Sequence, residues 1–237
     1  QMERVLGQRK DALNAWYKYD VGKTGDVLHL ANAVFIQDNP ELTVSEDFIR
    51  AVEQYYETDI LVTAFNEQTL VDINQYVEDN TNGMIRDILD QIPREAVMYL
   101  VNALAFEAEW PEVYLETSVE KTTFTREDGT QQPVELMHSS EYQYIEDELA
   151  TGFIKPYKGG DYAFVALLPR EGVSVADYVA SLTGEHLLEM LRNPVDTKVF
   201  AAIPKFESEY SADMAEVLKD MGMADAFDVN KADFSRM

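Results

Sequence analysis

The stretch that decides the fold is residues 96–110, AVMYLVNALAFEAEW. Residues 96–106 carry no charge, and Asn102 is the one strongly polar side chain among them. A strand with one face in water alternates apolar and polar residues, and this run does not alternate. It therefore predicts a strand that is buried on both faces in the middle of a large sheet. A buried helix is the competing interpretation, but the signals that follow are those of strands and turns.

Asn102 is the polar exception in this strand. Buried amides need hydrogen-bond partners, so we expect Asn102 to bond to groups from another segment. A satisfied core amide is favoured over a chemical role at this position. Residues 27–36 are also apolar on both faces, with Asn32 in the middle, and they predict a second buried central strand.

Other segments surround these two strands. Apolar spacing predicts a helix over 2–19, one or two helical turns over 84–89, and a helix over 174–191 with a break near Gly184. Three more helices are predicted to begin after the capping residues Ser45, Asn66 and Ser211. Further strands are predicted at 60–62, 162–168 and 199–206, and a hairpin joins 121–126 to 131–137 through Asp128-Gly129. This order predicts an α+β fold. No linker divides the chain, so residues 1–237 are expected to form a single domain.

Composition limits the classes of function. The chain has 237 residues and a formal net charge of −25, which argues against nucleic acid and anionic membranes as partners. No apolar run reaches the length of a membrane span. The absence of cysteine excludes disulfides, thiolate metal sites and a cysteine nucleophile within these residues.

No set of residues with catalytic or metal-binding spacing occurs. The histidines His29, His138 and His186 lie far apart in the sequence, and a structural or surface role is favoured for each. No serine stands in a Gly-x-Ser-x-Gly context, and no glycine loop would cradle a phosphate. The acidic run 146–148 is interpreted as a solvated loop, with weak calcium binding as the alternative. We therefore predict no enzyme activity, no metal and no cofactor.

Several segments resemble the serpin family of serine protease inhibitors, in the family's order and over nearly the whole chain. They are residues 28–35 (LHLANAVF), 73–77 (INQYV) with 81–83 (TNG), 102–110 (NALAFEAEW), 166–169 (ALLP), 203–206 (IPKF) and 217–227 (VLKDMGMADAF). The resemblance implies a mixed fold with a large central sheet, smaller sheets and surrounding helices. In it, 96–106 would be the third strand of the large sheet and 27–36 the second, with helix 67–82 across the sheet face.

The resemblance also assigns roles to two residues. Asn102 would match a buried asparagine where the large sheet opens. Trp110, which taken alone is a packing aromatic, would match a tryptophan at the top of that sheet, where the reactive loop first inserts. Serpins trap serine proteases, and some members trap cysteine proteases. The protease cleaves an exposed loop, which then inserts as a new strand, here beside 96–106.

The chain departs from the family's pattern at both ends. The family's reactive loop follows the residue that matches Met237, so no reactive-loop residue is named within 1–237. The resemblance thus implies an incomplete serpin-like domain, an extracellular habitat, and as partners a target protease and the chain's own cleaved C-terminal fragment. A non-inhibitory binding or carrier protein and an inactive remnant are the alternatives. Alone, residues 1–237 are expected to expose the edge of 96–106, and either to aggregate or to form an open, unstable sheet.

Overall fold

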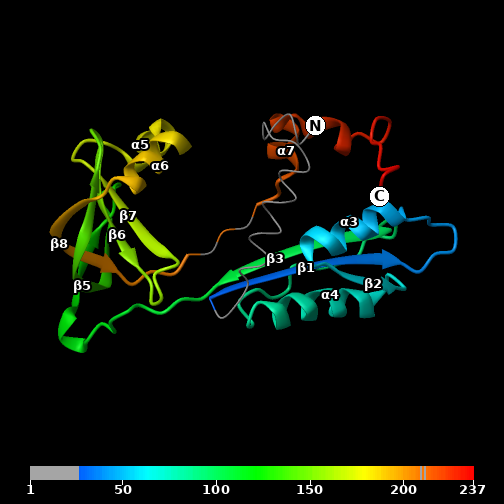
Figure 1. The fold of residues 1–237 in the computed structure, drawn as a ribbon, viewed down its shortest axis with the longest axis horizontal. Helices are drawn as coiled ribbons and strands as arrows, with labels where there is room; N and C mark the ends of the chain where they lie inside the picture. The colour runs from blue at the N-terminus through cyan, green and yellow to red at the C-terminus, as the bar shows by residue number, and fades with distance from the viewer. Residues whose placement is uncertain (1–26, 209, 211) are drawn as a thin grey trace. The chain divides into compact units, whose positions relative to one another are not determined.

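The computed structural model describes residues 27–208, 210 and 212–237, which fall into two compact units (Figure 1). The first unit comprises Gln1–Glu107 with Ser211–Met237, and the second comprises Ala108–Tyr210. The helix predicted over 2–19 and the cap predicted at Ser211 lie outside the described residues.

A three-stranded sheet forms the centre of the first unit. Strand β1 (Leu28–Gln37) lies between β2 (Asp59–Thr63), which is parallel to it, and β3 (Met98–Phe106), which is antiparallel to it. The predicted strands at 27–36, 60–62 and 96–106 are therefore confirmed, and the first and third of them are neighbours. The second edge of β3 has no strand partner among the described residues.

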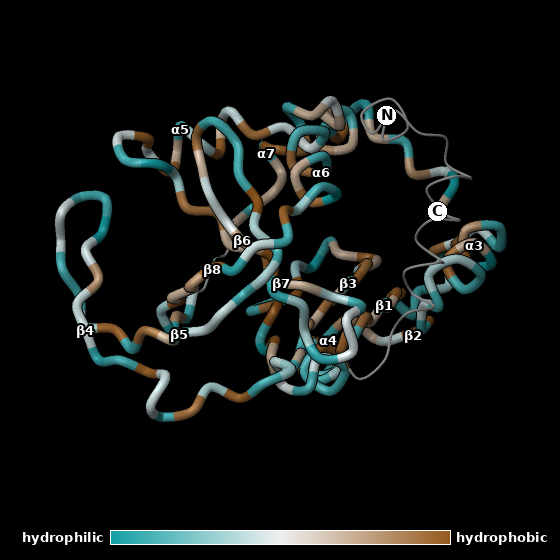
Figure 2. Tube along the Cα trace, turned by 60° about the vertical axis from the view of Figure 1, so that its left-hand side comes forward, coloured by the Kyte–Doolittle hydropathy of each residue, from teal (hydrophilic) through white to brown (hydrophobic). Residues whose placement is uncertain are grey.

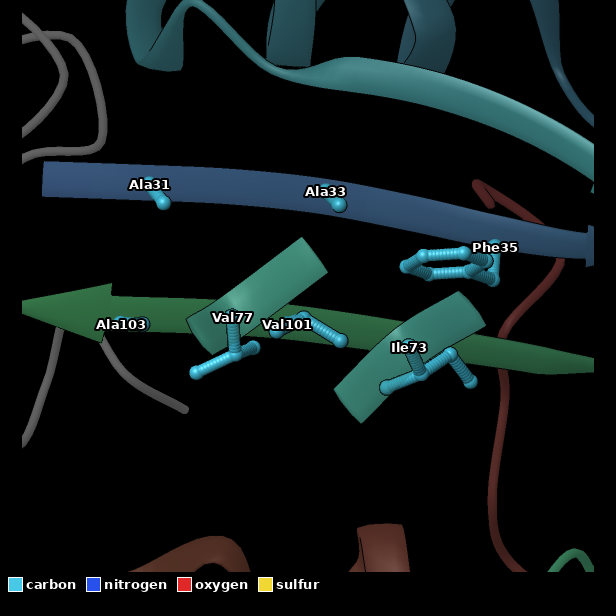
Figure 3. Packing of buried hydrophobic residues seen from close by; sticks show 7 residues of the cluster. All are labelled: Ala31, Ala33, Phe35, Ile73, Val77, Val101 and Ala103. Atoms are coloured by element: carbon cyan, nitrogen blue, oxygen red, sulfur yellow. The ribbon is translucent and has the colours of Figure 1, made fainter. Parts of the chain in front are cut away.

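Helix α4 (Glu67–Asn80) lies across one face of this sheet. Asn66 caps it as predicted, accepting hydrogen bonds from the backbone N–H groups of Gln68 and Thr69. Ile73 and Val77, one turn apart, are fully buried. They point at the sheet and pack against a set of side chains that lie on one face of β1 and β3, namely Ala31, Ala33, Phe35, Val101 and Ala103 (Figure 3).

The opposite face of the sheet is covered unevenly. Helix α3 (Glu46–Tyr56), capped by Ser45 as predicted, adjoins this face, and β1 is buried from Ala31 to Ile36. In β3 burial instead alternates, and Leu100 and Leu104 are 59% and 53% exposed. The prediction that 96–106 is buried on both faces is wrong for the described structure, although most residues of the strand are hydrophobic (Figure 2). The physical reason is that α4 covers only one of its faces.

The helical turns predicted over 84–89 are absent from the structure. Gly83, with φ of 72°, ends α4, and its N–H donates to the carbonyl of Glu78. Beyond it, side chains of the preceding helical segment take up the backbone donors. The N–H of Ile85 donates to Thr81 Oγ1, and the N–H of Leu89 donates to Asn74 Oδ1. Short helical segments complete this unit, namely α7 (Ala215–Leu218), η2 (Lys219–Met223) and η3 (Ala224–Phe227).

The second unit is built on a five-stranded antiparallel sheet. Its strands are β4 (Val119–Thr125), β5 (Gln131–Glu146), β6 (Ala150–Pro156) and β7 (Ala163–Pro169) in that order, with β8 (Val195–Pro204) also paired to β5. The predicted hairpin is β4–β5, and the predicted strands at 162–168 and 199–206 are β7 and β8. A short turn, η1 (Glu116–Ser118), precedes β4.

Two short helices follow β7 in the chain. Helix α5 (Val175–Ser181) is separated from α6 (Gly184–Arg192) by Leu182 and Thr183. The break that was predicted near Gly184 is thus confirmed. Thr183 caps α6 by accepting a hydrogen bond from the N–H of His186.

Candidate functional site

The first candidate residue, Asn102, belongs to a chain of amides in the first unit. Asn102 lies directly opposite Asn32 in the antiparallel register of β3 and β1. Its side-chain Nδ2 donates to Asn32 Oδ1 at 2.7 Å, and Asn32 Nδ2 donates to the backbone carbonyl of Tyr56 at 2.7 Å. The amides therefore link β3, β1 and the end of α3.

The structure corrects one part of the prediction for Asn102. Its side chain is bonded to another segment as predicted, but the residue is exposed, whereas Asn32 is only 9% exposed. Both side chains lie on the face of the sheet opposite α4. A cavity of about 430 Å³ opens on that face between β1, β3 and α3, lined in part by Val34, Phe48 and Leu100. The buried member of the amide pair is thus Asn32, which the sequence analysis did not single out as the partner.

The backbone of Asn32 is bonded from the face of the sheet that α4 covers. The Tyr76 hydroxyl, carried by α4, lies 2.9 Å from the carbonyl oxygen of Asn32 and 2.9 Å from Asp59 Oδ2. Burial raises the pKa of Tyr76, and the hydrogen bond and negative charge of the Asp59 carboxylate raise it further. Tyr76 therefore stays protonated and ties α4 to β1 and β2.

The second candidate residue, Trp110, lies in the second unit. Its indole stacks on the Tyr157 ring, with centroids 4.5 Å apart and an interplanar angle of 14°, and meets the Phe164 ring edge-on at 6.0 Å. The Lys155 ammonium lies 5.1 Å from the centroid of the indole ring. Lys158 fixes the chain just before Trp110, because its backbone N–H donates to the carbonyl of Glu109 and its Nζ lies 2.6 Å from Glu109 Oε2.

The prediction of a solvated loop at 146–148 holds only in part. Glu146, the last residue of β5, and Glu148 are exposed, but the Asp147 side chain is only 10% exposed. Asp147 accepts hydrogen bonds from the N–H groups of Leu149 and Ala150, from the Tyr178 hydroxyl and from His186 Nε2 at 3.0 Å. Asp147 therefore joins the β5–β6 turn to α5 and α6.

The protonation of Asp147 follows from these contacts. Burial acts to raise the pKa of this carboxyl, but the hydrogen bonds from His186, from the two backbone N–H groups and from Tyr178 together lower it below its ordinary value. No group of three or more histidine, aspartate or glutamate side chains in the described part of the chain is arranged to hold a metal ion. His29 instead lies 3.1 Å from Asn82 Nδ2, and His138 lies 3.2 Å from Glu120 Oε2.

The described helices include none that is long and apolar enough to cross a membrane.

Comparison with known proteins identifies the family. The family model described as serpin (serine protease inhibitor) matches residues 1–237. The chain belongs to the serpin family. Among curated proteins, an uncharacterized serpin-like protein of Methanosarcina acetivorans is 31% identical over 221 residues, which are 90% of this chain and 51% of that protein.

Solved serpin structures show the same fold. The thermophilic serpin tengpin in its native state is 42% identical, with a TM-score of 0.92 over 100% of this chain and 62% of tengpin. Tengpin in its latent state is 43% identical, also with a TM-score of 0.92, over 99% of this chain and 66% of tengpin. The chain thus spans about half the length of the Methanosarcina serpin and about two thirds of tengpin. The mixed α+β serpin fold predicted from the sequence is confirmed.

Proposed function

We propose that this serpin chain is part of a suicide inhibitor of serine proteases, which acts by cleavage of a reactive loop and insertion of that loop beside β3. The observation that carries the proposal is the second edge of β3. In the described sheet, β3 pairs with β1 on one side, and no described strand pairs with its other edge. The backbone along such an edge can accept a further strand, and an inserted strand would form a new ladder of hydrogen bonds there.

The chemistry of the trap belongs to the protease. The serine oxygen of the protease attacks the carbonyl carbon of the scissile bond, the C–N bond breaks, and the leaving amine takes a proton. The result is an ester between the protease and the N-terminal side of the cleaved loop. Insertion of the loop beside β3 would then carry the protease away before water hydrolyses the ester. Strand addition and the release of stored strain are the known means by which serpins do this.

Three side chains are proposed to act where the sheet opens. Asn102 and Asn32 join β3 to β1 on the face opposite α4, so they would keep these two strands together while the other edge of β3 accepts the loop. Trp110 is proposed to lie where the loop begins to insert.

The test uses the natural full-length protein and a panel of trypsin-, chymotrypsin-, elastase- and subtilisin-like proteases. The expected result is an SDS-resistant complex of inhibitor and protease, with a large rise in the melting temperature of the cleaved inhibitor. A protease whose catalytic serine is replaced by alanine is the control and should form no such complex. Cleavage that releases active protease, with an unchanged melting temperature, would contradict the proposal and favour a non-inhibitory binding or carrier protein.

A further inference from the structure

A nearly buried ion pair lies beside Trp110. Glu141 on β5 and Lys155 on β6 have side chains that are 10% and 11% exposed, and Lys155 Nζ lies 2.5 Å from Glu141 Oε1. In every other ion pair of the described residues, at least one side chain is 35% exposed or more. Burying two charges is costly unless the geometry is good and further hydrogen bonds satisfy them. We therefore expect the groups around this pair to satisfy both charges.

The pair is part of a closed ring of interactions. The Tyr114 hydroxyl donates to Ser139 Oγ at 3.3 Å, and Ser139 Oγ donates to Glu141 Oε1 at 2.6 Å. The ring closes because the Lys155 ammonium lies 5.3 Å from the centroid of the Tyr114 ring. Each hydroxyl has one proton and uses it once, and the Glu141 carboxylate accepts from both Ser139 and Lys155. The segment that carries Tyr114 is thereby tied to β5 and β6.

The same ammonium is directed at the indole of Trp110. Its distances of 5.1 Å from the Trp110 ring and 5.3 Å from the Tyr114 ring lie within the range of about 6 Å over which a cation is attracted to an aromatic face. The attraction is stronger where water is excluded. Since the indole is the best aromatic partner for a cation, Lys155 favours one orientation of Trp110.

The strand geometry makes Lys155 one of three groups that hold Trp110. Lys155 and Tyr157 are two residues apart and so project to one side of an extended chain. Phe164 lies directly opposite Lys155 in the β6–β7 register, which puts the two side chains on one face of the sheet. The indole therefore meets a stacked ring, an edge-on ring and a cation. An apolar side chain at position 155 would fill space but would supply no attraction specific to the ring face.

We propose that Lys155 is a positioning residue that orients Trp110, with Glu141 as its fixed counterion, and that this orientation governs how efficiently the reactive loop inserts. The second half rests on the proposed function, because it takes Trp110 to lie where insertion begins. The loss of the cation would let the indole adopt other orientations. Insertion would then compete less well with hydrolysis of the ester, and more inhibitor would be consumed as a substrate.

The experiment labels the natural full-length protein with 5-fluorotryptophan and records its ¹⁹F spectrum. The Trp110 resonance is the one that disappears in Trp110→Phe. Lys155→Met should shift or split this resonance, since the loss of one desolvated cation–ring contact changes the balance of orientations by about tenfold. Lys155→Arg keeps a cation and should preserve the resonance. Lys198→Met is the matched control, because the Lys198 ammonium lies 4.7 Å from the centroid of the Phe200 ring, and both residues are exposed on β8.

The second readout is the number of inhibitor molecules consumed for each protease trapped. Lys155→Met should raise this number at least about twofold, and Lys155→Arg should restore it. Should Lys155→Met fail to fold because Glu141 is left unpaired, Lys155→Met combined with Glu141→Leu removes both charges and is measured in its place. An unchanged Trp110 resonance in the variant that lacks the cation would overturn the positioning role.

The two readouts separate the two proposals. A moved resonance with an unchanged consumption ratio would overturn the role of Lys155 in insertion. If the unmutated protein traps no protease, the proposed function fails, and the ¹⁹F spectra still decide whether Lys155 orients Trp110.

Discussion

The side-chain amides of Asn102 and Asn32, which lie opposite each other on β3 and β1, are joined by a hydrogen bond of 2.7 Å although one residue is exposed and the other is buried. This difference in burial matters because replacing Asn32 and replacing Asn102 should change the stability of the fold by different amounts. Removing a group that leaves buried partners unsatisfied costs more than removing one that water can replace.

The first prediction follows from this difference in burial. Asn32→Ala should lower the free energy of unfolding by about 1–3 kcal/mol, because the Tyr56 carbonyl loses its amide donor. Asn102→Ala should cost less, since water reaches its position. Urea unfolding measures both. Asn80→Ala is the control, because Asn80 also donates to a helix carbonyl, that of Tyr76, but is exposed, and it should change stability by less than about 0.5 kcal/mol. Equal costs at positions 32 and 102 would contradict the assignment.

A second prediction concerns the packing of α4 on the sheet. Ile73 is fully buried between the helix and the strands (Figure 3), so Ile73→Ala should cost about 2–5 kcal/mol through lost burial and the cavity left behind. Val71 lies on the same helix but is 55% exposed, and Val71→Ala should be nearly neutral. Thermal or urea unfolding of the two variants tests this. A similar loss in both would mean that α4 does not pack as described.

The third prediction is a dependence on pH. The pKa of Asp147 is lower in the folded protein than its ordinary value, so this carboxylate stabilises the fold above the unfolded-state pKa, and the contribution is lost as pH falls through the folded-state pKa. Asp147→Asn should therefore cost about 1.5–3 kcal/mol at pH 7. The difference from the unmutated protein should shrink below about pH 4.

The neighbouring exposed residue provides the control for Asp147. Glu148→Gln removes one negative charge from the same turn without removing the buried acceptor, and its stability should match that of the unmutated protein across the pH range. Unfolding curves recorded from pH 3 to pH 8 give the comparison. A constant difference between Asp147→Asn and the unmutated protein over that range would show that the charge of Asp147 does not contribute.

The fourth prediction tests the close approach of β6 and β7. A Cβ atom added at Gly152 would overlap the backbone carbonyl oxygen of Ala166, which cannot move without disturbing the strand pairing. Gly152→Ala should therefore cost about 3 kcal/mol or more. Gly184 is the matched control, since no atom lies near its added Cβ and it begins α6. Gly184→Ala should be neutral or slightly stabilising. A stable Gly152→Ala protein would place the two strands further apart.

Local chemistry made much of the fold predictable. Ser45 and Asn66 cap their helices, and Asp128-Gly129 turns the β4–β5 hairpin, because capping and turn formation depend on residues within a few positions. The turns predicted over 84–89 do not form. Residues 85 and 89 have helical spacing, but the side chains of Thr81 and Asn74 accept hydrogen bonds from their backbone N–H groups in place of helix carbonyls.

The candidate site was less predictable. Asn102 and Trp110 were singled out from the sequence, but Asn32, Glu141 and Lys155 were not. A single polar residue in an apolar strand was the available signal, since Asn32 and Lys155 each interrupt such a run. That signal says that a partner is needed without saying which one. Glu141 and Asp147 were hidden among many acidic residues, most of which are solvated.

The sequence by itself determined most of the elements and their order, the α+β class and the family, because periodicity, caps and turns are encoded over a few residues and the motifs recur in a fixed order. It did not predict β6. Only the tertiary structure decided that one face of β3 stays exposed, that Asn102 meets Asn32, and that Lys155 meets both Glu141 and Trp110. Strand register and the coverage of each sheet face join residues far apart in the chain. These relations depend on which surfaces pack together, and an apolar pattern specifies that a surface is apolar without specifying what covers it.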